Sequence, residues 1–307
     1  MAPTPLYCLD KGVNNLYIKR DDLFPFSFGG NKARKGVLFW EEFLAGGYSC
    51  VVTYGSSSSN HCRVIANLAA SYKVPCYIIS PEEASQPTYN SYMMGLFGAE
   101  ITCVSVHEVH DTIEAKLQEL EDQGEKPYFI YGGGHGNIGT EAYVQAYKEI
   151  SEFEEREGIS FDYIFHASGT GTTQAGLIAG KLLSGDTKQI VGISIARKNP
   201  RGGLIVQESV EEYLRSIGSN IDKQTIDYNT LFVDDYTSDG YGSTSDEIQE
   251  VIQRVIKMYG IPLDKTYTAK AWWGMERYLI SHEIAGKNIL FIHTGGTPLF
   301  FDGIHLS

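Results

Sequence analysis

Short apolar runs and amphipathic helical segments alternate along almost the whole of this 307-residue chain. The runs CVVTYG (50–55), PCYIIS (75–80) and NILFIHT (288–294) have the apolar density of buried strands. Between such runs, apolar residues recur at helical spacing, as at 32–44, 61–72 and 172–184. Further strands are predicted at 15–22, 99–106, 127–132, 162–168 and 189–196, and further helices near 88–97, 107–123, 140–155, 203–217, 244–258 and 268–285. The alternation predicts an α/β fold with parallel-type sheets covered by helices on both faces.

The charge balance limits the partners of such a fold. The chain has 25 basic and 38 acidic residues, a net charge of −13. This balance argues against a general nucleic-acid partner and against an acidic membrane surface. An anionic ligand would have to be held by local groups.

The sequence of the N-terminus and the spacing of the cysteines indicate where in the cell the protein is located. The first residues, MAPTPLYCLDKGV, lack a basic region followed by an apolar run, and no apolar stretch is long enough to span a bilayer. The five cysteines (8, 50, 62, 76 and 103) are odd in number and scattered, without a CxxC pair. We therefore expect reduced thiols in a cytoplasmic protein, with neither a disulfide framework nor a metal site.

Three turns rich in Gly, Ser, Thr or Asn lie where predicted strands give way to helices: 55–60, 169–173 and 294–297. Parallel α/β sheets bind ligands at this end of their strands. In GTGTTQAG (169–176), backbone N–H groups and the helix dipole could cradle a phosphate, with hydroxyls from Thr172 and Thr173. A tight turn with N-capping threonines is the structural alternative.

A pair of lysines follows two glycines at the start of the helix predicted at 32–44, in GGNKARK. We expect Asn31 to cap this helix and Lys32 and Lys35 to share one face. A neighbouring cation and burial both disfavour the ammonium form, which would make Lys32 nucleophilic enough for a Schiff base, while Lys35 pairs with a phosphate. A basic helix start on the surface is the alternative. A Schiff-base lysine and a phosphate cradle together indicate pyridoxal 5′-phosphate.

A competing pattern favours a different cofactor. Gly134-x-Gly136-x-x-Gly139 follows a predicted strand and precedes a helix, as in dinucleotide-binding folds. The acidic residues about 20 positions downstream, Glu154 and Glu155, fall in a polar helix end and not at the tip of a second strand. A nicotinamide-dependent oxidoreductase using Gly134–Gly139 is therefore kept as an alternative, as is a ligand-binding module without catalysis.

Five motifs, in order, resemble the D-cysteine desulfhydrase and 1-aminocyclopropane-1-carboxylate (ACC) deaminase family, which has the tryptophan-synthase-β-like fold of pyridoxal-phosphate enzymes (fold type II). They are LYIKRDD…FGGNKARK, GSSSSNHCR, GTGTTQAGL, LDKTYTAKAWWGM and FIHTGGTP, and the resemblance covers about residues 5–303. It implies a large cofactor-binding domain (1–47 and 138–307) and a smaller inserted α/β domain (48–137), with the cofactor between them. We expect a homodimer.

The resemblance also assigns roles to individual residues. It implies that Lys32 carries the cofactor, that Lys35 binds its phosphate, that Asn60 bonds the ring hydroxyl and that Ser59 handles the substrate. The phosphate loop would be Gly169, Thr170, Gly171, Thr172 and Thr173, although the family more often has GSGGT. Tyr241 and Tyr267 match two active-site tyrosines.

Two positions bear on the reaction. ACC deaminases typically carry Glu after the second tyrosine and Leu in HLGG, whereas this chain has Thr268 and Thr294, as desulfhydrase-like members do. A hydroxyl leaves the pyridine ring nearer neutral, which suffices when a good β-leaving group departs directly. The family commonly has Gln where this chain has Ser58, so the substrate pocket is expected to differ. The resemblance implies α,β-elimination on a small β-substituted amino acid, D-cysteine first, with ACC deaminase as the alternative.

Overall fold

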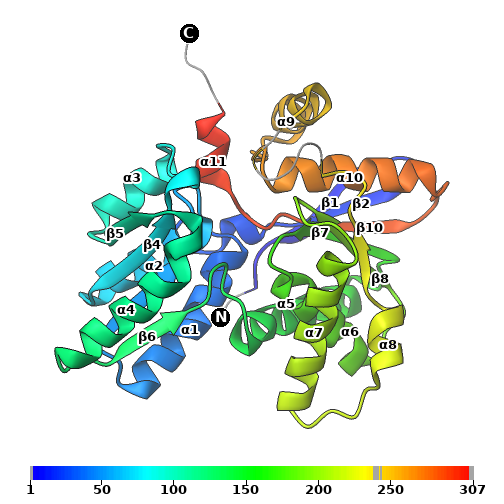
Figure 1. Ribbon diagram of the computed structural model, residues 1–307. Helices are drawn as coiled ribbons and strands as arrows, with labels where there is room; N and C mark the ends of the chain where they lie inside the picture. Colours follow the sequence, from blue (N-terminus) through cyan, green and yellow to red (C-terminus); the bar gives the residue numbers. More distant parts are fainter. Residues whose placement is uncertain (1–2, 238–241, 243, 304–307) are drawn as a thin grey trace.

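The computed structural model describes residues 3–237, 242 and 244–303 and contains two sheets, each covered by helices (Figure 1). The six-stranded sheet has the order β1-β2-β10-β7-β8-β9, and the four-stranded sheet has the order β5-β4-β3-β6. All neighbours pair in parallel except β1 and β2, which form an antiparallel edge. The predicted α/β class with parallel-type sheets is confirmed.

The six-stranded sheet collects strands from both ends of the chain, because β10 inserts between β2 and β7. Its strands are β1 (Leu6–Lys11), β2 (Asn15–Lys19), β7 (Tyr163–Ser168), β8 (Gln189–Ser194), β9 (Leu231–Val233) and β10 (Asn288–Ile292). Its helices are α5 (Asn137–Glu157), α6 (Thr172–Ser184), α7 (Arg201–Ser216), α8 (Lys223–Tyr228), α9 (Asp246–Tyr259) and α10 (Thr268–Ser281).

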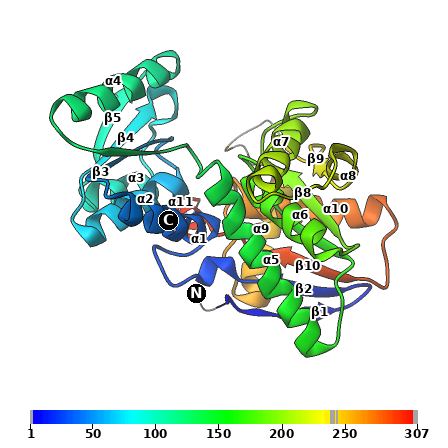
Figure 2. The ribbon, with the colours of Figure 1, turned by 90° about the horizontal axis from the view of Figure 1, so that it is seen from below.

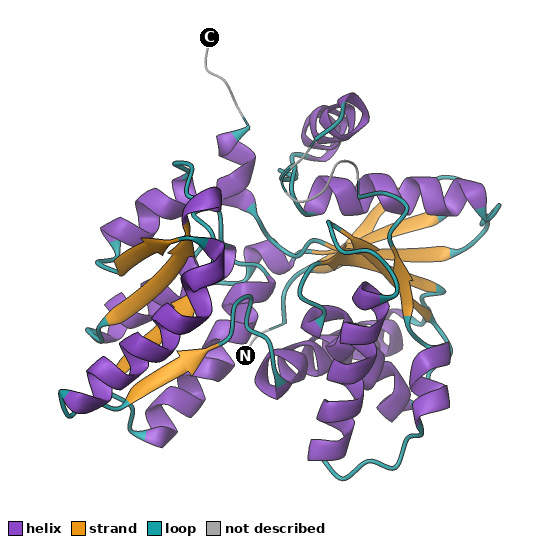
Figure 3. Cartoon of the chain, in the orientation of Figure 1, coloured by secondary structure: helices purple, strands orange, loops and turns teal. Residues whose placement is uncertain are grey.

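Side chains of this sheet alternate between two cores, as expected for strands buried on both faces. On β10, Leu290 and Ile292 pack with α5, α6 and α7, whereas Ile289 and Phe291 pack with α9 and α10. Figure 3 shows the helices on both sides of the strands. The two-sided apolar pattern of NILFI fixes this strand in the middle of the sheet.

The four-stranded sheet lies within residues 50–130. Its strands are β3 (Cys50–Tyr54), β4 (Cys76–Pro81), β5 (Glu100–Val104) and β6 (Pro127–Ile130), and the helices around it are α1 (Asn31–Gly46), α2 (Asn60–Tyr72), α3 (Tyr89–Leu96) and α4 (Val109–Asp122). Short 3-10 turns lie at Asp21–Leu23, Glu82–Ala84 and Val106–Glu108, and α11 (Thr297–Asp302) ends the described chain. Among the described residues, no helix is long and apolar enough to cross a membrane.

Helix α1 packs with the smaller sheet although it precedes residue 48. Its buried Ala33, Phe39, Trp40 and Phe43 share one core with α2, β3 and β6. Helix α11 lies beside α3, where the Asp302 carboxylate accepts a hydrogen bond from the Tyr89 backbone N–H at 2.8 Å. The view from below in Figure 2 shows α1 with the smaller sheet. The division at 47/48 and 137/138 stays a prediction.

Candidate active site

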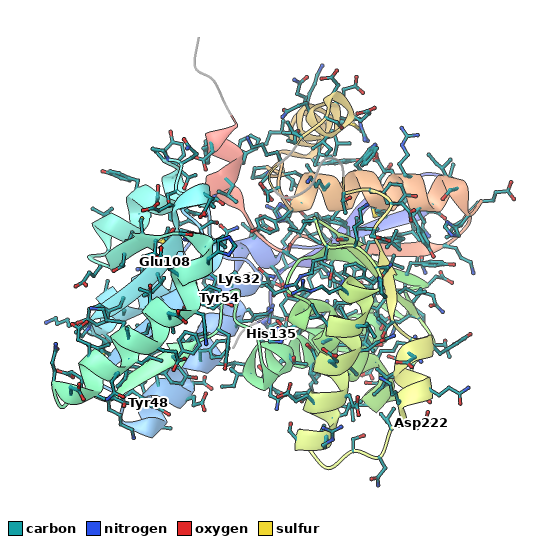
Figure 4. The ribbon with its side chains drawn as sticks, viewed as in Figure 1. Lys32, Tyr48, Tyr54, Glu108, His135 and Asp222 are labelled. Carbon is teal, nitrogen blue, oxygen red and sulfur yellow. The ribbon has the colours of Figure 1, made fainter. Side chains whose placement is uncertain are left out.

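A cavity of about 590 Å³ lies where the carboxyl ends of the strands of both sheets face each other. Segments that follow β3, β6, β7, β8 and β10 line it, together with residues of α1, α2 and α7. In Figure 4, the labelled Lys32, Tyr54 and His135 lie between the two sheets. The predicted site residues that line this cavity are Lys32, Ser59, Asn60, Gly169, Thr170, Gly171, Thr173, Tyr267 and Thr294.

Lys32 stands on the first turn of α1, and the glycines before it make this placement possible. Gly30 has φ 91°, and a Cβ there would lie 2.7 Å from the Thr294 carbonyl oxygen. The Lys32 Nζ donates a hydrogen bond of 2.7 Å to the Gly133 carbonyl. The prediction that Asn31 caps the helix is wrong: the helix begins at Asn31, Gly30 is the N-cap, and Asn31 donates its side-chain amide to the Thr173 hydroxyl at 3.0 Å.

The Lys32 amine is easily deprotonated. Burial lowers the pKa of its ammonium from 10.5 to about 8, the Cys62 thiol opposes this lowering, and the positive charge of Arg197 adds to it. The neighbouring cation that acts on Lys32 is thus Arg197, from the turn after β8. Burial, and then the charge of Lys32, lowers the pKa of Lys35 well below its usual range.

The loop from Gly169 to Thr173 joins β7 to α6, and Gly171 is the helix N-cap with φ 101°. The backbone N–H groups of Gly169, Thr170 and Gly171 donate to no other described residue. The first helical N–H groups have no partner within the helix either, so the loop presents donors at the positive end of the helix dipole. This donor set fits a phosphate.

Lys35 lies behind this loop. Its side chain is buried, and its Nζ donates a hydrogen bond of 2.6 Å to the Thr172 hydroxyl. Neither Lys35 nor Thr172 lines the cavity. The Lys35 amine therefore contacts the loop from outside the cavity.

Ser59 and Asn60 start α2 and present polar groups to the cavity. The Ser59 hydroxyl is the N-cap and accepts a hydrogen bond from the Cys62 backbone N–H at 3.1 Å, which leaves its own proton available to a ligand. Ser58, the position that departs from the family pattern, does not line the cavity, whereas Ser56 does. Ser58 contacts Ser56, their hydroxyl oxygens being 3.1 Å apart, so it acts on the pocket through its neighbours.

The two threonines expected near the pyridine nitrogen occupy different environments. Thr294 lines the cavity at the end of β10. Thr268 is fully buried outside the lining, and its hydroxyl donates a hydrogen bond of 2.8 Å to the Asp264 carboxylate. That carboxylate also accepts the backbone N–H groups of Thr266, Tyr267 and Thr268, so it caps α10 and fixes Tyr267 at the cavity. Tyr241 lies outside the described residues.

The comparisons with known proteins agree with this geometry. Residues 1–295 match the family model of pyridoxal-phosphate-dependent enzymes. The chain belongs to this family. It is 31% identical to a D-cysteine desulfhydrase of Serratia proteamaculans (strain 568), over 93% of this chain and 88% of that protein. It is 34% identical to a Thermotoga maritima protein named provisionally as an ACC deaminase, over 96% of this chain and 94% of that protein.

A solved structure extends the agreement to the fold of this pyridoxal-phosphate-dependent enzyme. The crystal structure of an ACC deaminase homologue has a TM-score of 0.88 and 30% identity, and the match covers 99% of this chain and 92% of that chain. The enzyme therefore falls within the D-cysteine desulfhydrase and ACC deaminase family, and the predicted fold type II and cofactor are confirmed.

The cavity of this pyridoxal-phosphate enzyme fits its cofactor. The cavity is lined by the Lys32 amine, whose pKa is lowered, by the unpaired backbone N–H groups of the loop 169–173, and by the polar side chains at the start of α2. The three glycines of the competing dinucleotide pattern, Gly134, Gly136 and Gly139, do not line this cavity, whereas the neighbouring Gly133 lines it and accepts the Lys32 hydrogen bond. Of the two acidic residues of that pattern, Glu154 is buried in an ion pair with Lys188 at 2.9 Å, and Glu155 is exposed. The family match and this pairing remove the support for a nicotinamide cofactor.

Several polar lining residues were not predicted from the sequence, among them Tyr54, Tyr131, His135, Arg197 and Glu212. Tyr54 ends β3, Tyr131 directly follows β6 and Arg197 follows β8 by three residues. The rule that located the three predicted turns would have found these positions had it been applied to every strand end. His135 and Glu212 carried no such signal.

Proposed function

We propose that this pyridoxal-phosphate enzyme is a lyase that catalyses α,β-elimination on a small β-substituted amino acid, with D-cysteine as the first candidate and pyruvate, ammonia and sulfide as the products. The observation that carries the proposal is the Lys32 amine, which lines the cavity with a pKa of about 8 and so exchanges protons near neutral pH. Thr294, which lines the cavity where ACC deaminases typically carry Leu, supports elimination over ring opening.

The cofactor, when bound, supplies an electron sink that stabilises negative charge on the substrate's α-carbon. Lys32 would hold the cofactor, and its free amine would accept the proton from the α-carbon of the substrate. The Cβ–S bond then breaks, sulfur leaves with the electron pair, and Tyr267 donates a proton to it from the cavity wall. The unsaturated product takes up one water and yields pyruvate and ammonia. Tyr241 is the second predicted proton donor.

Arg197 supports a substrate that carries a carboxylate, as every amino acid does. Its half-buried guanidinium lines the cavity and forms no hydrogen bond or ion pair with any described residue. A cation held partly out of water without a counter-ion favours an anionic ligand. We propose that Arg197 binds a carboxylate of the substrate, so that Arg197→Leu raises KM more than tenfold for every substrate while kcat changes less.

The alternative function is ACC deaminase, and a substrate panel separates the two. Purified enzyme with bound cofactor is assayed with D-cysteine, L-cysteine, β-chloroalanine and ACC, by release of pyruvate or, for ACC, of the corresponding four-carbon keto acid. We expect clear activity with at least one β-substituted alanine and little or none with ACC. A higher kcat/KM for ACC than for all three alanines would contradict the proposal.

The quaternary structure and the location of the enzyme stay predictions. A homodimer in the cytoplasm is what we propose for this chain. Sedimentation equilibrium of the purified protein measures the number of subunits, and fractionation of the source cells measures the location.

A further inference from the structure

The side-chain amide of Asn60 has a defined orientation in the cavity wall. Its Oδ1 accepts a hydrogen bond of 2.9 Å from the Asn90 Nδ2 and one of 3.4 Å from the Arg63 Nη2. Arginine nitrogens only donate, so the Asn60 atom that faces Arg63 is the carbonyl oxygen. Asn60 lines the cavity, and its Nδ2 donates to none of the described residues. The amide N–H₂ is therefore the group that Asn60 offers to a ligand.

Asn90 fixes the same orientation independently. It is fully buried at the start of α3, and its Nδ2 also donates to the Ser58 backbone carbonyl at 2.9 Å. A carbonyl only accepts, so the Asn90 atom between Ser58 and Asn60 is the amide nitrogen, and its two hydrogens serve the two acceptors. Its own Oδ1 is buried without a hydrogen-bond partner. A buried oxygen without a hydrogen bond lowers the stability of the fold. We infer that Asn90 is kept here for the two hydrogen bonds that its Nδ2 donates, to Ser58 and to Asn60.

Arg63 links Asn60 to the chain just before Lys32. It is fully buried on α2, and no carboxylate of the described residues lies within ion-pair distance. Its Nη1 donates to the Ser27 backbone carbonyl and, at 2.9 Å, to the Ser27 hydroxyl, and its guanidinium lies 5.5 Å from the centre of the Phe28 ring. Ser27 and Phe28 both have positive φ angles, 44° and 57°, and stand immediately before the two glycines that open the Lys32 helix. One buried cation thus supports both the turn before α1 and the amide at the start of α2.

We propose that Asn90 and Arg63 are positioning residues that hold the Asn60 amide with its nitrogen toward the cavity, as a hydrogen-bond donor to the ring hydroxyl oxygen of the bound cofactor. The inference rests on the proposed role of Asn60 and adds the two residues that set its polarity. Without them the amide could turn over and present its oxygen, which would repel a negatively charged ring oxygen.

The consequence is a shift in a spectroscopic pKa. A donor stabilises the ring oxygen when it is negatively charged, so it lowers the pKa of the lysine-bound cofactor, read from the pH dependence of its visible absorption. The loss of one hydrogen bond to a charged group is expected to raise this pKa by about 1 to 2 pH units. Loosened packing alone would change stability without moving the absorption in this way.

The experiment titrates the visible absorption of the holoenzyme and of four variants. Asn60→Ala defines the full rise in pKa, and Asn90→Leu and Arg63→Met are each expected to give most of it. The double variant Asn60→Ala with Arg63→Met should rise no further than Asn60→Ala alone, because Arg63 acts through Asn60. If Asn90→Leu does not fold, Asn90→Asp keeps the side-chain shape while removing the paired donors, and the same rise is expected.

The possible outcomes distinguish the role of Asn60 from the positioning roles of Asn90 and Arg63. A matched control is Asn288→Leu, because Asn288 also donates its amide to a backbone carbonyl, Ser160 at 2.9 Å, and accepts from a second asparagine, Asn15 at 2.9 Å. No spectral change is expected there. An unchanged pKa in Asn60→Ala would overturn both the role of Asn60 and this inference. A shift in Asn60→Ala with none in the Asn90 variants, or an additive shift in the double variant, would overturn the inference alone.

Discussion

Replacing Lys32 by methionine should stabilise the cofactor-free protein while abolishing its activity. In the described residues neither Lys32 nor Lys35 forms an ion pair with a carboxylate, and burial lowers the pKa of both. The folded protein therefore holds an ammonium group in a place that disfavours its charge. Methionine has a similar length and no charge, so the variant removes this cost.

The size of the effect follows from the Lys32 pKa. The difference between 10.5 in an unfolded chain and about 8 in the folded protein corresponds to about 3 kcal/mol at pH 7. The variant also loses the hydrogen bond to the Gly133 carbonyl, which costs about 1 kcal/mol, so a net gain of about 2 kcal/mol remains. Because the unfolded chain binds more protons between pH 8 and 10.5, the wild-type free energy of unfolding contains a contribution that rises with pH through this window. The gain should therefore fall to about zero at pH 10.

Urea denaturation of the apoproteins at pH 7 and at pH 10, followed by circular dichroism, measures this difference. Lys148→Met is the matched control, because the Lys148 side chain is 80% exposed and should change the free energy of unfolding by less than about 0.5 kcal/mol at either pH. A Lys32→Met protein that is less stable than wild type at pH 7, or whose gain is the same at both pH values, would refute the reasoning.

Three further predictions concern the holoenzyme. Borohydride reduction followed by peptide mapping should place the pyridoxyl group on Lys32; a label on another lysine would contradict this role. Lys35→Ala should weaken cofactor binding by about 1.5 to 3 kcal/mol in a fluorescence titration, since its charge supports the Thr172 side of the loop; unchanged affinity there and in Thr173→Val would mean that the phosphate binds elsewhere. Tyr267→Phe should lower kcat for elimination from D-cysteine by about 10² or more, with little change in KM, if Tyr267 protonates the leaving group; an unchanged kcat would leave Tyr241 as the donor.

Strong periodicity made most of the fold predictable. The segment 172–184 was predicted as a helix and is α6 (Thr172–Ser184), because its apolar face repeats at helical spacing and a glycine stands at each end. The elements that were missed are short or mixed in polarity. β1, with the sequence LYCLDK, and the three-residue β9 are edge strands, so few of their side chains need to be apolar. Their pairing depends on neighbours that a local pattern does not contain.

The cavity was predictable where its chemistry is local in sequence. The loop 169–173 and the turn before Lys32 combine glycines, hydroxyls and a helix start, and that combination is readable as a phosphate or amine site. Arg197 is not part of such a combination, and only its place three residues after β8 could have indicated it. Its charge lowers the pKa of Lys32. Asn90 and Arg63 are still harder to find, since each acts through Asn60 and has no motif of its own.

Thr268 and Thr294 show why a motif position does not reveal what its side chain does. Both threonines lie in motifs that match cofactor-binding motifs of the family. The Thr268 hydroxyl donates a hydrogen bond to the buried Asp264 carboxylate, whereas Thr294 lines the cavity. The carboxylate Oδ1 that bonds Thr268 also lies close to Gly296, where an added Cβ would be 2.5 Å away, so Asp264 packs against the turn after β10. A glutamate at 268 would lose two hydrogen bonds with Asp264 and bring a second carboxylate beside it. We therefore expect a glutamate at 268 to be repelled by the Asp264 carboxylate unless one of the two is protonated.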